Sequence, residues 1–194
     1  FNTLNTIAAV CGEEHAERAR RLIMQLSTFF RRITKQEGDS VSLEEELEYI
    51  NAYLDIEKAR FGDRLQVERQ IHLSREGFHT PVPILALQPI VENAVKHGLS
   101  KKSSRGKLLI KAEEEDAQVV IEVQDTGVGM SEEFQRDLLK KTATDPLTEN
   151  GQTGIGLSNI RERMARRYGD RFQMSLASIP GQGTTVRVVL PKLL

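Results

Sequence analysis

Apolar residues in the first third of the chain recur every three or four positions, which is the spacing of one helix face. Residues 1–34 carry such a seam, and the Gly-Asp-Ser at residues 38–40 interrupts it. Ser42, followed three positions later by Glu45, predicts a capping box that opens a second helix. Two such helices predict an antiparallel hairpin, and two copies of the hairpin would form a four-helix bundle. The alternative is a hairpin that packs only on the part of the chain downstream of it.

The pattern changes after residue 63, where alternating apolar and polar positions indicate strands between shorter helices. Strands and helices mixed in this way predict a two-layer α/β sandwich around one sheet. We expect strands near residues 65–73, 107–114, 118–125, 172–178 and 184–190, and helices near residues 84–95 and 156–168. The stretch 131–153 is polar and aperiodic, which is typical of a functional or disordered loop. The chain is therefore predicted to be α+β, with a helical hairpin at residues 1–63 and the sandwich at residues 64–194.

The composition is that of an ordinary globular chain. Of 194 residues, 39% are hydrophobic and 28% are charged, and the formal net charge of −1 argues against a general role in binding nucleic acid or a membrane surface. The single cysteine, Cys11, rules out an internal disulfide and fits a reducing compartment. No apolar run approaches the roughly 20 residues of a membrane span, and we find no signal peptide. Because the sequence opens at Phe1 within a predicted helix, we expect it to be a fragment of a longer protein.

The residues around Asp125 are the most informative in the chain. The alternation through Val119, Ile121 and Val123 places Asp125 on the same buried face, where a carboxylate needs a specific partner. The two glycines that follow, at 127 and 129, let the backbone approach another group closely. This combination predicts a nucleotide pocket, and the alternative is a strand that simply ends in an Asp-Thr-Gly turn.

Two further clusters of polar residues and glycines point the same way. Asn93, Lys96 and His97 share one helix face, where an amide oxygen beside an ammonium group suits Mg²⁺ and phosphate. The plainer interpretation is a solvated polar face. Gly154 and Gly156 open a helix, and backbone amides at a helix start bind phosphate. The chain has neither a complete dinucleotide-binding fingerprint nor a Walker-type phosphate loop.

In this order the three clusters resemble the Bergerat ATP-binding domain shared by sensor histidine kinases, gyrase, Hsp90 and MutL. Leu-Gln-Pro-Ile-Val-Glu-Asn-Ala-Val-Lys-His-Gly at 87–98 resembles the N box, Asp-Thr-Gly-Val-Gly-Met at 125–130 the G1 box, and Thr-Gly-Ile-Gly-Leu at 153–157 the G2 box. The resemblance implies that ATP and Mg²⁺ are bound and that residues 131–153 form a lid over the nucleotide. It assigns binding to Asn93, Lys96, His97, Asp125, Gly127, Gly129, Met130, Thr153, Gly154, Ile155, Gly156, Leu157 and Thr184.

The same resemblance implies roles for individual residues. Asn93 would hold Mg²⁺, Asp125 would accept from the adenine amino group, and Thr184 would support the adenine beside it. Hydrolytic members of the superfamily carry a water-activating Glu four residues before the N-box Asn, and Pro89 stands at that position here. We therefore expect slow ATP turnover. Glu92, next to Asn93, remains either a catalytic base or a salt-bridge partner.

The N-terminal third resembles the bacterial sensor kinases of the LytS/YehU type, through Phe-Asn-Thr-Leu-Asn-Thr-Ile at 1–7, Phe-Phe-Arg at 29–31 and the segments 46–50 and 57–65. This implies a homodimeric cytoplasmic kinase core of a bacterial inner-membrane sensor, without membrane contact of its own, that serves a response regulator. In that family the first two residues end a Pro-His-Phe-Leu-Phe-Asn motif. The phosphoacceptor His would lie three residues before Phe1, so we expect this fragment to lack it, and His15 lacks the motif.

Two other functions fit parts of the sequence. A degenerate kinase that serves as a nucleotide-gated dimeric scaffold has less reason to keep all three boxes intact. An anti-sigma-type serine kinase shares the ATP-binding fold, but the long helical hairpin with its Phe-Asn opening argues against it. The leading hypothesis is the dimerisation helices and catalytic domain of a two-component histidine kinase.

Overall fold

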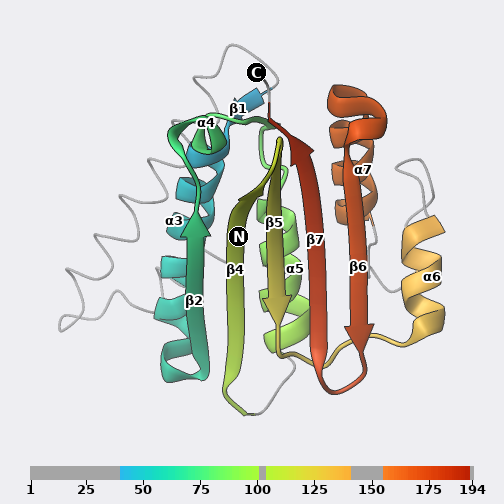
Figure 1. The fold of residues 1–194 in the computed structure, drawn as a ribbon. Helices are drawn as coiled ribbons and strands as arrows, with labels where there is room; N and C mark the ends of the chain where they lie inside the picture. The colour runs from blue at the N-terminus through green and yellow to red at the C-terminus, as the bar shows by residue number, and fades with distance from the viewer. Residues whose placement is uncertain (1–39, 101–103, 141–154, 193–194) are drawn as a thin grey trace.

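The computed structural model describes residues 40–100, 104–140 and 155–192, and it shows a sheet with helices packed on one face (Figure 1). The first helix of the expected hairpin lies outside these described residues. In chain order the elements are β1 (Ser40–Ser42), α3 (Leu43–Phe61), a 3-10 helix (Gly62–Arg64), β2 (Leu65–His72), α4 (Arg75–Phe78), β3 (Pro81–Pro83), α5 (Gln88–Asn93), a π-helix (Ala94–Leu99), β4 (Gly106–Glu115), β5 (Gln118–Asp125), α6 (Glu132–Lys140), α7 (Ile155–Tyr168), a 3-10 helix (Gly169–Arg171), β6 (Gln173–Ile179) and β7 (Gly183–Pro191).

The five strands of the main sheet lie in the order β2-β4-β5-β7-β6 and correspond to the five predicted strands. β2 and β4 are parallel, and the other neighbours are antiparallel. In this register Asp125 at the end of β5 is paired with Thr184 on β7, and Thr184 is paired with Ser178 on β6. Three polar residues therefore stand in a row across three adjacent strands.

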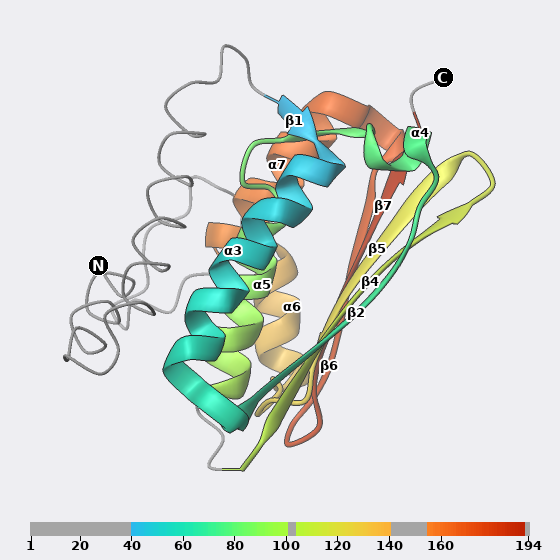
Figure 2. The ribbon, with the colours of Figure 1, turned by 90° about the vertical axis from the view of Figure 1, so that its left-hand side faces the viewer.

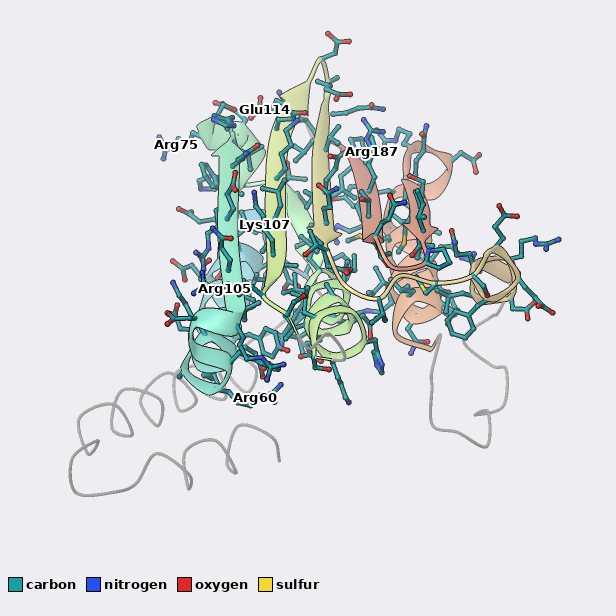
Figure 3. All side chains as sticks on the ribbon, turned by 90° about the horizontal axis from the view of Figure 1, so that it is seen from below. Arg60, Arg75, Arg105, Lys107, Glu114 and Arg187 are labelled. Carbon is teal, nitrogen blue, oxygen red and sulfur yellow. The ribbon has the colours of Figure 1, made fainter. Side chains whose placement is uncertain are left out.

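The two faces of the sheet differ in chemistry. Helices α3, α5 and α7 cover one face (Figure 2), where Leu108 and Ile110 are at most 2% exposed. The opposite face carries charged side chains, among them Lys107 and Arg187 (Figure 3), and Arg187 Nε lies 3.2 Å from Glu122 Oε1. The alternation of apolar and polar residues along the strands thus sorts them between a buried core and an open charged face. The predicted α/β sandwich is confirmed.

Helix α3 is the described half of the expected hairpin. Its capping box is present, because the Ser42 hydroxyl accepts the N–H of Glu45 and the Glu45 carboxylate accepts the N–H of Ser42. Ile50 and Leu54, each 1% exposed, belong to the same hydrophobic cluster as Leu87 of the sandwich. Helix α3 therefore packs on the sandwich. The four-helix bundle and the domain boundary after residue 63 stay predictions.

The helix expected over residues 84–95 begins and ends later than the sequence suggested. It starts at Gln88 and continues beyond Asn93 as a π-helix. Leu85 has a φ of +55° and so adopts a left-handed conformation, which a right-handed helix excludes. The N–H groups of Leu85, Leu87 and Gln88 donate to the carboxylate of Glu46 on α3 over 3.1, 2.8 and 3.2 Å. A side chain from another helix thus caps α5.

The stretch 131–153, predicted as an aperiodic loop, begins with a helix. In α6 the Ser131 hydroxyl accepts the N–H of Phe134 over 3.3 Å. Phe134 and Leu138, one turn apart, both line a cavity beside the sheet. The expectation was wrong for this part because the helix has only nine residues, and packing rather than intrinsic propensity stabilises so short a helix.

Candidate functional site

A cavity of about 350 Å³ lies between the sheet and the helices at one end of the sandwich. Residues from β5, β6, β7, α5, α6 and α7 line it, and most of them are apolar. Its polar side chains are those of Asn93, His97, Asp125, Ser131 and Thr184. An apolar cavity with a few convergent polar groups is the usual form of a small-molecule site.

Asp125 occupies the position that the strand pattern predicted. It is 4% exposed at the end of β5, and its Oδ1 accepts the N–H of Gly127 over 2.7 Å. The adjoining Thr126 anchors the turn to β4, because its hydroxyl accepts the Lys107 N–H and its own N–H donates to the Lys107 carbonyl. The buried carboxylate therefore sits on a turn that is fixed on both sides, and it lines the cavity.

Two glycines bring the π-helix against this turn. A Cβ at Gly98 would lie 2.5 Å from Asp125 Oδ1, and a Cβ at Gly127 would lie 2.3 Å from the carbonyl carbon of Gly98. The N–H of Val128 donates to the Gly98 carbonyl over 3.3 Å. Gly127 therefore allows the close backbone approach that the sequence predicted, and the segment that it approaches is the π-helix that continues α5 beyond Asn93.

The same turn also contacts the β6–β7 hairpin. Gly129 has a φ of +64°, and a Cβ there would lie 2.0 Å from the Ile179 carbonyl oxygen. The N–H of Gly181 donates to the Val128 carbonyl over 2.8 Å. Gly183, with a φ of +120°, leaves room for the Asp125 carbonyl oxygen. Backbone contacts through glycine thus fix Asp125 relative to Thr184.

The helix that faces this turn presents its polar residues in two directions. Asn93 and His97, four positions apart, both line the cavity. Glu92 instead accepts a hydrogen bond from the Gln88 side chain over 2.7 Å. Burial raises the pKa of Glu57 on α3, and the negative charge of Glu92 raises it further. Glu92 therefore takes part in the contact between α3 and α5, and its role as a base stays a prediction.

The sequence reasoning missed two polar residues beside the cavity, Gln135 on α6 and Ser178 on β6. The Gln135 amide donates to the carbonyls of Met130 and Ser178 over 3.0 and 2.8 Å and accepts the Ser178 N–H over 3.2 Å. Ser178 follows Met174 and Leu176 on the inward-facing side of β6. Ser178 therefore continues an inward apolar alternation on β6, as Asp125 does on β5.

The other predicted site residues fall into three groups. Gly129, Met130, Leu157 and Thr184 line the cavity. Lys96 is exposed and lies outside the cavity lining. The third motif is described only in part: Thr153 and Gly154 lie outside the described residues, and Ile155 and Gly156 begin α7. The binding roles of all these residues remain predictions.

Within residues 40–100, 104–140 and 155–192, no three or more His, Cys, Asp or Glu side chains are grouped so that they would hold a metal ion. None of the helices in that part of the chain combines the length and the hydropathy of a membrane crossing.

Two protein families match the sequence. The Histidine kinase family matches residues 1–65, and the Histidine kinase-, DNA gyrase B-, and HSP90-like ATPase family matches residues 82–194. The second match covers more than half of the chain, so the chain belongs to the histidine kinase-, DNA gyrase B- and HSP90-like ATPases. The resemblance to the Bergerat ATP-binding domain is therefore confirmed.

The curated relatives of the chain include sensor kinases. Sensor histidine kinase BtsS of Escherichia coli (strain K12) is 38% identical over 191 residues, which are 98% of this chain and 31% of BtsS. Sensor protein LytS of Bacillus anthracis is 34% identical over 193 residues, which are 99% of this chain and 32% of LytS. The resemblance to LytS-type sensor histidine kinases is confirmed. The chain spans about a third of the length of these relatives.

Solved structures agree on the fold. The catalytic domain of histidine kinase ThkA superposes with a TM-score of 0.57 at 16% identity, over 81% of this chain and 97% of that domain. ThkA in complex with response regulator protein TrrA gives a TM-score of 0.56 at 15% identity, over 93% of this chain and 51% of ThkA. At this identity the likeness shows the fold alone.

Proposed function

We propose that the chain is the cytoplasmic kinase core of a two-component sensor histidine kinase. In this proposal it binds Mg-ATP in the cavity and directs the γ-phosphoryl group to a histidine, from which a response regulator receives it. The observation that carries the proposal is the pairing of Asp125 and Thr184 in the wall of a cavity whose helical wall presents Asn93. An acceptor pair suited to an adenine amine and an oxygen ligand suited to Mg²⁺ then share one cavity.

The sheet side of the cavity suits the base. Leu176 and Val186 provide apolar surface for a flat ring, and Leu157 contributes more from α7. An ionised Asp125 carboxylate only accepts hydrogen bonds, so at this position it selects a group with hydrogens to donate, such as the exocyclic amine of adenine. A buried acceptor without a donor is costly, and this cost gives the contact its specificity.

The helix side suits the phosphates and the metal ion. The Asn93 side chain supplies one oxygen ligand, and Mg²⁺ in nucleotide sites commonly completes its coordination with phosphate oxygens and water. When bound, Mg²⁺ neutralises charge on the phosphates. His97 lines the cavity beside Asn93. Lys96 is exposed outside the cavity lining, and we propose that it reaches the phosphates from there as a point charge.

Phosphoryl transfer requires positioning and charge neutralisation more than covalent assistance from the protein. Pro89, at the position of the activating Glu in hydrolytic relatives, has no group to activate water. The lack of an activating Glu at this position therefore favours retention of the γ-phosphoryl group until an acceptor side chain reaches it. This supports a kinase over an ATP hydrolase.

The partners and the location follow from the relatives and are proposed with the activity. The match of residues 1–65 to the Histidine kinase family supports a homodimer formed through the N-terminal helices. The complex of ThkA with response regulator protein TrrA supports a response regulator as the receiving partner. The names of the curated relatives, sensor histidine kinase and sensor protein, support a sensor. That the sensor is membrane-anchored and that its kinase core lies in the cytoplasm is proposed from the resemblance to the LytS/YehU-type kinases.

Labelling with [γ-³²P]ATP tests the proposal and separates it from its alternatives. The full-length natural protein should acquire acid-labile phosphohistidine and pass the label to a response regulator receiver domain. Acid-stable phosphoserine on a partner protein would favour the serine kinase. Nucleotide binding without any phosphorylated product would favour the scaffold. The Asp125→Asn variant of the same protein is the control for labelling that does not depend on the cavity.

A further inference from the structure

Ser178 lies behind the cavity wall and contacts the hydroxyl group of Thr184, which lines the cavity. The Ser178 hydroxyl oxygen is 2.8 Å from the Thr184 hydroxyl oxygen, and the two residues are paired across β6 and β7. Thr184 lines the cavity, whereas Ser178 is not among its lining residues. Ser178 can therefore act on a ligand only through its neighbours, which are Thr184 and Met130, because both line the cavity.

The surroundings of Ser178 determine which hydroxyl donates. The N–H of Met130 points at Ser178 Oγ over 2.9 Å and can only donate, and the Gly183 carbonyl lies 2.9 Å from Ser178 Oγ and can only accept. A serine hydroxyl has one hydrogen and two lone pairs. The hydrogen therefore goes to the Gly183 carbonyl, and the Met130 N–H occupies one lone pair. The second lone pair accepts the hydrogen of the Thr184 hydroxyl.

This arrangement is held in place by α6. The Gln135 amide bonds both the N–H and the carbonyl of Ser178, and it also bonds the Met130 carbonyl. Gln135 thereby holds the backbone of both residues, so that the Met130 N–H stays directed at the Ser178 hydroxyl oxygen. The direction of the Thr184 hydrogen bond thus depends on contacts among α6, the turn after β5 and the β6–β7 hairpin.

We infer that Ser178 is a positioning residue that makes Thr184 a hydrogen-bond acceptor toward the cavity, so that the site selects an exocyclic amine over a carbonyl on the purine ring. Asp125, paired with Thr184 on the other side, is also an acceptor. An amine has two hydrogens for these two acceptors, whereas the 6-oxo group of hypoxanthine or guanine would face them with lone pairs. The inference rests on the proposed function, because it deepens the choice of nucleotide at that site.

The affinities of ATP and inosine triphosphate test the inference, since the two differ at the 6-amino group. The wild type should prefer ATP. In Ser178→Ala the Thr184 hydroxyl loses its acceptor and becomes free to donate, so the preference for ATP over inosine triphosphate should fall roughly tenfold. Ser175→Ala, an exposed serine on the same strand, is the matched control and should keep the wild-type ratio.

A second substitution shows whether the effect passes through Thr184. In a Thr184→Val background, Ser178→Ala should no longer change the ratio of the two affinities. If Ser178→Ala does not fold, as judged by its thermal melt, Thr184→Val alone should lower the ratio and Ser178→Thr should preserve it. An unchanged ratio in folded Ser178→Ala, or in Thr184→Val, would overturn the role of Ser178 and leave ATP binding intact. A wild type that binds neither nucleotide would instead overturn the proposed function.

Discussion

Glu46 offers the sharpest test of how α3 holds α5, the helix that carries Asn93. Its side chain is 0% exposed, and its carboxylate accepts three backbone N–H groups ahead of and at the start of α5. The residue before α5, Leu87, provides no side-chain cap. If Glu46 is truncated to Ala, these donors lose their acceptor.

The cost follows from the burial of these groups. The hydrogen bonds to Leu87 and Gln88 are buried, and an unsatisfied buried donor costs about 1–3 kcal/mol, which gives about 2–6 kcal/mol for the pair. Truncation also removes a carboxylate whose burial is unfavourable, since burial raises the pKa of Glu46 above 4.5. We therefore expect Glu46→Ala to lower the free energy of unfolding by about 2–4 kcal/mol.

Urea unfolding followed by circular dichroism measures this loss. Glu46→Gln keeps an oxygen for Leu87 and Gln88 and loses only the acceptor of the half-buried Leu85 N–H, so it should cost less than Glu46→Ala, about 1 kcal/mol. Because the raised pKa makes ionisation of Glu46 costly in the folded state, wild-type stability should fall relative to Glu46→Gln as the pH rises through that pKa. Glu44→Ala, an exposed glutamate on the same helix, is the control. Equal unfolding midpoints for Glu46→Ala and Glu44→Ala would refute the capping role.

Three further substitutions test other parts of the site and the fold. Gly98→Ala would place a methyl group 2.5 Å from Asp125 Oδ1, so nucleotide affinity should fall by about tenfold; unchanged affinity in a binding titration would contradict that contact. Asn93→Ala should make ATP binding insensitive to Mg²⁺, and a persisting dependence would count against the metal role. Hydrogen bonds from Lys192 and Ser74 lower the pKa of Glu114 to about 2. The stability that the ionised Glu114 gives the folded protein is therefore present above pH 4.5 and is lost as the pH falls toward 2. Glu114→Gln should therefore flatten acid unfolding in that interval, and an unaltered acid profile would argue against the contact.

The strands and Asp125 were predictable because their signal is local. A period of two gave all five strands of the main sheet, and the same period placed Asp125 on the buried face. Ser178 follows the same rule on β6. Unlike a buried carboxylate, a buried serine hydroxyl costs little once it finds a hydrogen-bond partner, so its inward position alone did not mark Ser178 as a site residue.

The features that the sequence did not reveal depend on contacts between distant residues. Glu46 lies on an apolar helix face, where a sequence pattern gives no reason to expect a buried carboxylate. The N–H groups that it accepts lie about 40 positions away in the sequence, so no local signal reveals them. The left-handed conformation of Leu85 has no local signal such as glycine. Helix α6 is too short to be stable alone, and it depends on the hydrogen bonds of Gln135 to a strand 43 residues downstream.

Magnesium-dependent ATP binding is the central claim, and calorimetry on the wild type and Asp125→Asn tests it most directly. Asparagine keeps the shape of the side chain but offers a single acceptor oxygen. The N–H of Gly127 and the adenine amine would then compete for this oxygen. We predict that the wild type binds ATP more tightly with Mg²⁺ than without it and that Asp125→Asn binds with about 1–3 kcal/mol less free energy. Equal affinities for the two proteins, or no binding by the wild type, would contradict the account.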